Sequence, residues 1–131
     1  MRSFDQSHRK EATMKEAIIK DVEIKKVNSI FRRKPKGLGF EDTDAVTITA
    51  ESGSKTVSRT FYICLKPDGT FNPKAINKGS QAHRSRFVSF LKYYGFADDV
   101  KGYNIQQESR NWIGKKITVE SFGDLNCIYI P

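Results

Sequence analysis

Apolar and polar residues alternate along several short segments of the chain, with the period of two that is typical of half-buried β-strands. The pattern is clearest over residues 45–50 and 56–66, which an ESGSK segment separates. Both segments are rich in β-branched and aromatic residues, so together they predict a β-hairpin. One face of the second strand is apolar except for an arginine and consists of Val57, Arg59, Phe61, Ile63 and Leu65.

Three further strands are predicted before and after this hairpin. Residues 17–27 alternate with a phase shift that indicates a bulge at Lys25 or Lys26. Residues 111–122 and 125–131 provide the last two strands, which a short Gly-Asp turn joins. Each of these strands needs a partner, because a single short strand leaves its backbone groups unpaired.

Residues 81–94 have the periodicity of an amphipathic helix. Ser80 is the predicted N-cap, and Gly95 ends the helix. Phe96 then predicts a Schellman-type ending that packs against Leu91. The predicted apolar stripe consists of His83, Phe87, Phe90, Leu91 and Tyr94. The residues expected on the solvated face are Arg84, Arg86, Lys92 and Tyr93.

The predicted order is strand, long loop over residues 28–44, strand, strand, helix, strand, strand. Five strands with one helix between the third and fourth is the order of the OB-fold, a small Greek-key barrel. A ferredoxin-like chain needs two helices, and a sandwich usually has none. The predicted fold class is therefore mainly β, with one OB-fold-like domain over residues 16–131 after a flexible basic arm at residues 1–15.

The composition fits one folded domain with an anionic partner. The length of 131 residues is typical of a single domain, and 37% hydrophobic residues suffice for a core. The net charge of +8 favours polyanions, with nucleic acid first. No segment predicts a membrane helix or a signal peptide, and the two cysteines form no CxxC pair. We therefore expect a soluble cytoplasmic protein with neither a disulfide framework nor a zinc site.

Positive charge is concentrated in the predicted loop between the first two strands. Residues 31–40 hold four cations, two phenylalanines and no acidic residue. Phosphates attract cations and unpaired bases stack on aromatic rings, so this loop predicts binding of single-stranded nucleic acid. The alternative is a solvated basic loop whose phenylalanines pack into the barrel. The candidate binding residues are Phe31, Arg32, Arg33, Lys34, Lys36 and Phe40.

The outward faces of the hairpin strands extend this candidate surface, because OB-folds bind oligonucleotides on strands 2 and 3. Tyr62 is the predicted aromatic platform there. The alternative is an ordinary polar outer face. Lys115 and Lys116, at the start of the fourth strand, are candidate contacts to a nucleic-acid backbone. The hydroxyl residues predicted to surround Tyr62 are Thr47, Thr49, Ser58 and Thr60.

Catalysis and metal binding have little support in the sequence. His8 and His83 form no arrangement with cysteine and aspartate that predicts nucleophilic catalysis, so His83 is interpreted as a packing residue. The EDTD segment at residues 41–44 is explained more simply as an acidic flank of the loop than as a metal site. No Walker or GxGxxG loop occurs. We expect neither an enzyme nor a bound cofactor.

Two segments resemble small phage and archaeal single-stranded-DNA-binding-like OB-fold proteins. One is RFVSFLKYYGF, a helix that ends in glycine, and the other is WIGKKITVES, a strand after a polar gap. The resemblance covers residues 80–121 and implies binding through strands 2 and 3 and the adjoining loops. The chain ends in LNCIYIP and not in the acidic tail of bacterial single-strand binders. The matching residues are Phe87, Phe90, Leu91, Gly95, Ile113, Gly114, Lys115, Ile117 and Val119.

Two hypotheses of function follow from these features. The first is a non-catalytic protein that binds single-stranded nucleic acid, with DNA favoured, by phosphate attraction and base stacking. The second is an interaction module, such as a phage-derived structural subunit, whose basic loop meets an acidic protein surface. The sequence leaves the choice between DNA and RNA, the base preference and the oligomeric state open.

Overall fold

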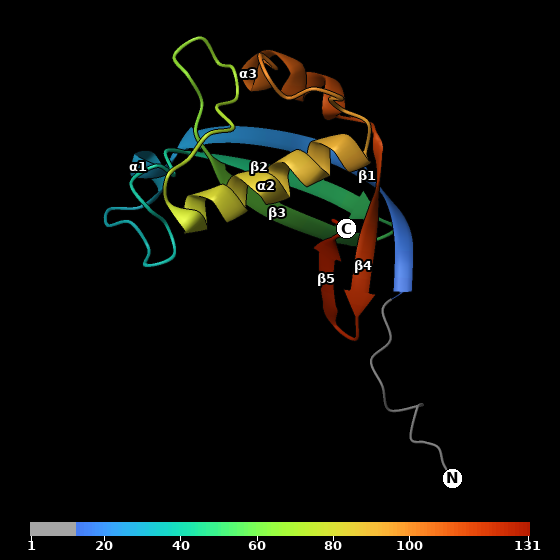
Figure 1. The fold of residues 1–131 in the computed structure, drawn as a ribbon. Coiled ribbons are helices and arrows are strands. Elements are labelled where there is room, and N and C mark those ends of the chain that lie inside the picture. The colour runs from blue at the N-terminus through green and yellow to red at the C-terminus, as the bar shows by residue number, and fades with distance from the viewer. Residues whose placement is uncertain (1–12) are drawn as a thin grey trace.

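The computed structural model describes residues 13–131 (Figure 1). Five strands form one antiparallel sheet in the order β3-β2-β1-β4-β5. The long strand β1 pairs with β4 through its first half and with β2 through its second half. The strands are β1 (Thr13–Lys26), β2 (Asp44–Ser52), β3 (Lys55–Ile63), β4 (Lys116–Phe122) and β5 (Leu125–Ile128).

The two outer strands of this sheet approach each other and nearly close it into a barrel. β3 and β5 lie in contact, and Arg59 Nη1 donates a hydrogen bond to the carbonyl oxygen of Ile128 at 3.2 Å. The main helix, α2 (Lys78–Tyr93), lies between β3 and β4 in the chain and packs against β3. The predictions of a mainly β fold, five strands and this helix position are therefore confirmed.

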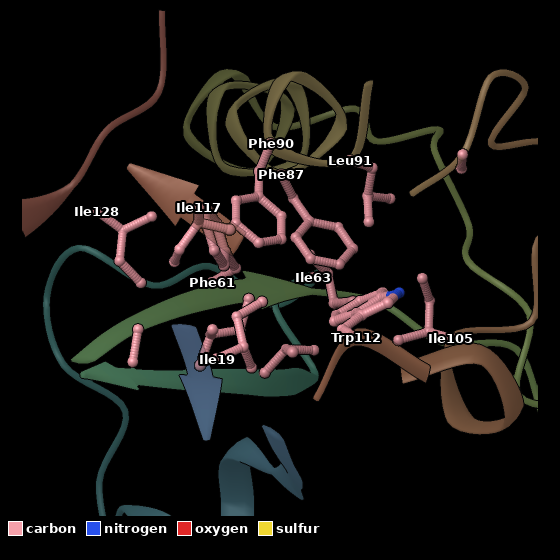
Figure 2. Packing of buried hydrophobic residues seen from close by; sticks show 14 of the residues in the cluster. Ile19, Phe61, Ile63, Phe87, Phe90, Leu91, Ile105, Trp112, Ile117 and Ile128 are labelled. Atoms are coloured by element: carbon pink, nitrogen blue, oxygen red, sulfur yellow. The ribbon is translucent and has the colours of Figure 1, made fainter. Parts of the chain in front are cut away.

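The core lies between the barrel interior and α2 (Figure 2). Phe87 and Phe90 project from the helix onto Phe61 of β3, with both ring-centroid distances at 5.1 Å. Trp112 is 1% exposed and completes the aromatic cluster beside Phe90. The predicted apolar face of β3 is confirmed, because Val57, Phe61 and Ile63 are all buried, as is Leu65 just after the strand.

The end of α2 confirms the predicted Schellman motif. Gly95 has a φ of 73°, and the backbone N–H of Phe96 donates to the carbonyl of Leu91 at 2.8 Å. The Phe96 ring packs on Phe90, with centroids 5.6 Å apart. The predicted N-cap was wrong: the helix begins earlier, and the Asn77 side chain caps it by accepting from the Ser80 backbone N–H at 3.2 Å.

The bulge in β1 lies at Lys20 and not at Lys25 or Lys26. It changes the phase of the strand, since Ala17 and Ile19 before it are buried and the inward positions after it are even-numbered. The phase shift that the sequence shows at Lys25 or Lys26 arises because Val27 has left the strand. It begins α1 (Val27–Ile30), a single helical turn.

Other boundaries also differ from those predicted, and the third and fifth strands end earlier, at Ile63 and Ile128. Residues 13–15 pair with β4, so the predicted arm ends earlier, and residues 1–12 lie outside the described part of the chain. The polar segment 98–111 is not only loop, because it contains α3 (Ile105–Glu108) and most of the 3-10 turn η2 (Ser109–Trp112). The fourth strand begins only at Lys116. Over residues 13–131, no helix has both the length and the apolar character required to span a bilayer.

Replacement of Leu91 by alanine should lower the free energy of unfolding by about 2–5 kcal/mol, because the side chain is fully buried under the barrel. Urea unfolding followed by the fluorescence of Trp112 measures this change. Lys92→Ala, at the exposed neighbouring position, is the control and should change stability by less than about 0.5 kcal/mol. Equal stability of the two variants would contradict the assigned helix face.

Candidate nucleic-acid interface

The basic loop over residues 31–43 connects α1 to β2 and has its own hydrogen bonds. The backbone N–H of Leu38 donates to the carbonyl of Pro35 at 3.0 Å. Lys34 Nζ donates to the carbonyl of Gly39 at 3.1 Å, and the Gly39 N–H donates to Asp42 Oδ2 at 2.9 Å. These hydrogen bonds give the predicted loop a defined shape, so the backbone that carries its outer side chains is fixed.

Asp42 connects this loop to the main helix. Its carboxylate is fully buried, and Oδ2 lies 3.2 Å from Nδ1 of His83 on α2. The other oxygen, Oδ1, has no hydrogen-bond partner within the described residues. The interpretation of His83 as a packing residue was therefore incomplete, because its ring also holds the loop carboxylate against the helix.

Glu41 and Arg84 join the same loop to the segment before α2. Both oxygens of Glu41 accept from the Ile76 backbone N–H at 2.9 Å, and one accepts from the Asn77 N–H at 2.7 Å. These hydrogen bonds from Asn77 and Ile76 lower the pKa of Glu41. Arg84 is 2% exposed and donates to carbonyls of Glu41, Asn72 and Lys74. Its predicted place on the solvated helix face was wrong.

Four of the six predicted binding residues of the loop are exposed. Arg32, Arg33 and Lys36 are exposed. Phe40 is 91% exposed, and the Lys34 ammonium lies 5.9 Å from its ring centroid. The alternative in which both phenylalanines pack into the barrel is wrong for Phe40. Phe31, at the end of α1, is half-buried.

The predicted hydroxyl residues form two pairs across β2 and β3. Thr47 Oγ1 lies 2.9 Å from Thr60 Oγ1, and Thr49 Oγ1 lies 3.0 Å from Ser58 Oγ. Each pair has two hydroxyl hydrogens and uses one internally, so one donor remains for a ligand. Tyr62 continues the same face, pairs with Ala45 in the sheet and is half-buried.

A cavity of about 340 Å³ lies where the loop, β3 and α2 meet. It brings the predicted Tyr62 and Thr60 together with seven residues that sequence reasoning had not placed in a site, among them Pro35 and Leu38 of the loop, and His83 and Arg86 of the helix. The sequence contained one indication that His83 and Arg86 lie together, because residues three apart share a helix face. The complete lining is Pro35, Gly37, Leu38, Arg59, Thr60, Phe61, Tyr62, His83 and Arg86.

The structure does not bring Lys115 and Lys116 to this surface. Lys116 pairs with Ile18 in the sheet, whereas the basic loop is reached through α1 after Lys26, at the far end of the same strand. Eight residues of strand separate these points, which corresponds to roughly 25 Å. Lys116 Nζ lies 3.7 Å from a carboxylate oxygen of Glu16.

The acidic EDTD segment is used in internal contacts. Asp44 is 1% exposed and accepts from Lys26 Nζ at 2.8 Å and from the Leu65 backbone N–H at 2.9 Å. Within residues 13–131, no three His, Cys, Asp or Glu side chains gather as a metal site would require.

No protein-family model matches the chain, and comparisons with curated proteins and with solved structures find no match either.

Glu41→Gln should destabilise the protein at neutral pH. The amide NH2 would face backbone N–H groups, from which the carboxylate now accepts hydrogen bonds. Since folding lowers the pKa of Glu41, its contribution is present above the unfolded pKa of about 4.3 and is lost as pH falls through the folded value. Thermal unfolding from about pH 7 to pH 3 should show the difference from wild type shrinking with acidity.

The control for this measurement is Glu51→Gln, which removes an exposed carboxylate on β2. Its melting temperature should stay close to that of wild type at neutral pH. A Glu41→Gln difference that is unchanged across the pH range would contradict the stabilising role of the charged carboxylate.

Proposed function

We propose that the protein is a non-catalytic binder of single-stranded nucleic acid, with single-stranded DNA as the preferred ligand, and that its barrel is an OB-fold. The ring order β1-β2-β3-β5-β4 and the helix between the third and fourth strands support this fold. In OB-folds, the loop between strands 1 and 2 and the surface of strands 2 and 3 bind oligonucleotides. The basic loop and the Tyr62 face occupy these positions.

The observation that carries the proposal is the separation of charge at this end of the barrel. Arg32, Arg33 and Lys36 are exposed, whereas the neighbouring carboxylates of Asp42 and Asp44 are buried in hydrogen bonds. The carboxylates therefore fix the loop without occupying its outer surface. A phosphate that approaches this surface meets cations first.

Aromatic surface accompanies these cations. The fully exposed ring of Phe40 follows them in the loop, and Tyr62 borders the adjacent cavity. Exposed aromatic rings next to cations suit unpaired bases, which stack on the ring while the phosphates meet the charges. In a duplex the bases are already stacked on one another, so this arrangement favours a single strand.

A second candidate function is docking of an acidic protein surface. It is favoured by Ile76, which is 90% exposed and is attached through its backbone to Glu41, next to Phe40. Two exposed apolar side chains on adjoining loops suit a protein partner, because protein interfaces have apolar centres. The two functions differ in the ligand that is sufficient for binding. A nucleic-acid binder needs only the phosphates and bases of an oligonucleotide, whereas the alternative needs an acidic protein.

Fluorescence anisotropy with a labelled oligothymidine of about 12 nucleotides tests the main proposal. We expect affinity that falls with salt, with log K decreasing by about 0.7 per phosphate contact for each unit of log salt concentration. A duplex of equal length and an oligouridine should bind more weakly. Absence of binding at low salt would overturn the proposal and favour the protein partner.

The triple variant Arg32→Ala, Arg33→Ala, Lys36→Ala should bind oligothymidine more weakly and reduce the magnitude of the salt slope by about 2, because three cations are removed. Its melting temperature should not change, since these side chains are exposed. The matched control removes the same charge elsewhere, through Lys15→Ala, Lys92→Ala and Lys101→Ala. Equal losses in both triple variants would indicate general charge attraction and not a loop site.

Tyr62→Ala should weaken oligothymidine binding by about 1–3 kcal/mol, whereas Tyr62→Phe should retain the affinity, because stacking uses the ring and not the hydroxyl. Anisotropy titrations of both variants, with circular dichroism to check folding, measure the difference. Equal affinities in wild type and both variants would exclude Tyr62 as a platform and leave Phe40 as the exposed ring of the site.

A further inference from the structure

Arg59 and Arg86 line the same cavity without an acidic partner. Within residues 13–131, neither guanidinium lies within 4.0 Å of a carboxylate oxygen. Arg59 reaches the cavity from the inward face of β3 and donates one hydrogen bond, to the carbonyl of Ile128. An arginine has five N–H donors, so most of those on this side chain remain available.

The two arginines also repel each other. Burial lowers the pKa of Arg59, and the positive charge of Arg86 lowers it further. Two like charges that share a partly enclosed space are unfavourable unless an anion lies between them. Guanidinium groups match the geometry of phosphate oxygens, which they bind through paired hydrogen bonds.

Apart from Thr60 and His83, the rest of the cavity lining is apolar or aromatic. Tyr62 lies on one side, and Pro35 and Leu38 of the basic loop lie on another. The lining includes no aspartate or glutamate, and the nearby Asp42 is fully buried with its carboxylate against His83. A ligand that fits this lining has a flat ring for the aromatic wall and an anionic group for the arginines.

The cavity is held open by contacts that do not involve a ligand. The hydrogen bond between His83 and Asp42 joins the helix wall to the loop wall at 3.2 Å. Lys34 and Asp42 both bind Gly39 and so fix the turn that carries Leu38. A preformed cavity loses little conformational entropy on binding, which favours even a small ligand. Its volume of about 340 Å³ lies in the range of small-molecule sites.

We propose that this cavity binds one nucleoside monophosphate unit, with its phosphate between Arg59 and Arg86 and its base against Tyr62. The inference rests on the proposed function in taking nucleic acid as the source of the unit, and it adds α2 to the binding surface. The basic loop then holds the neighbouring phosphates of the strand, and the cavity holds a single nucleotide.

Titration calorimetry with dTMP, thymidine and inorganic phosphate tests this inference. We expect dTMP to bind at least about tenfold more tightly than either fragment, because only dTMP provides both base and phosphate. Arg86→Gln should weaken dTMP binding by about tenfold or more, which is the loss expected for a charged hydrogen bond. The matched control is Lys92→Gln, at an exposed position on the same helix, and it should leave dTMP binding unchanged.

Competition against labelled oligothymidine distinguishes a free nucleotide from a unit within a strand. If the strand uses the cavity, dTMP displaces the oligothymidine, and Arg86→Gln weakens both ligands by similar factors. If dTMP binds but does not affect oligothymidine, the cavity is a site for free nucleotides, and its use by the strand is overturned.

The outcomes also separate this inference from the proposed function. Oligothymidine binding without dTMP binding would overturn the cavity site and leave single-strand binding intact. Binding of dTMP without oligothymidine would support the cavity site and overturn single-strand binding. Equal affinity for dTMP and inorganic phosphate, or equal dTMP affinity in wild type and Arg86→Gln, would overturn the assigned roles of Tyr62 and Arg86.

Discussion

The buried guanidinium of Arg84 is the group on which the arrangement of this end of the barrel depends. It donates to backbone carbonyls of two separate segments, at Glu41 in the basic loop and at Asn72 and Lys74 before the helix. A buried cation is costly unless its donors are satisfied, and here backbone oxygens satisfy most of them. The two loops are therefore held together, as Figure 1 shows at the end of the barrel where α2 begins.

The acidic residues at the end of the basic loop and at the start of β2 also make their contacts inside the protein. Glu41 binds backbone N–H groups just before α2, Asp42 binds His83 and Gly39, and Asp44 binds Lys26. Because each carboxylate has a partner inside the protein, the outer surface of the loop keeps its positive charge. A sequence in which a run of cations precedes a run of carboxylates thus becomes a structure with the two kinds of charge on different sides.

The hairpin and the helix ending could be predicted from the sequence, because both depend on local patterns: alternation over β2 and β3, and a glycine followed by Phe96. Arg84 could not. It lies three residues before Phe87 and so shares the buried face, but charge alone favours the solvated face. The cavity was missed for a different reason, since it forms only where Pro35 and Leu38 meet β3 and α2. The spacing of residues within one segment does not indicate that the loop, β3 and α2 come together.

The residues that make the internal contacts of the loop differ from those on its outer surface. Binding can therefore be measured independently of folding. Arg84, Asp42 and Glu41 make their contacts inside the protein, so their replacement changes the loop before it changes any ligand. Arg86 makes no internal hydrogen bond or ion pair within the described residues, and Phe40 is almost wholly exposed. A loss of affinity at such positions therefore reports on the ligand contact itself. Arg84 shows that an internal role for an arginine requires acceptors inside the protein. Arg86 contacts no such acceptor among the described residues, and the cavity that it lines holds a second cation, Arg59.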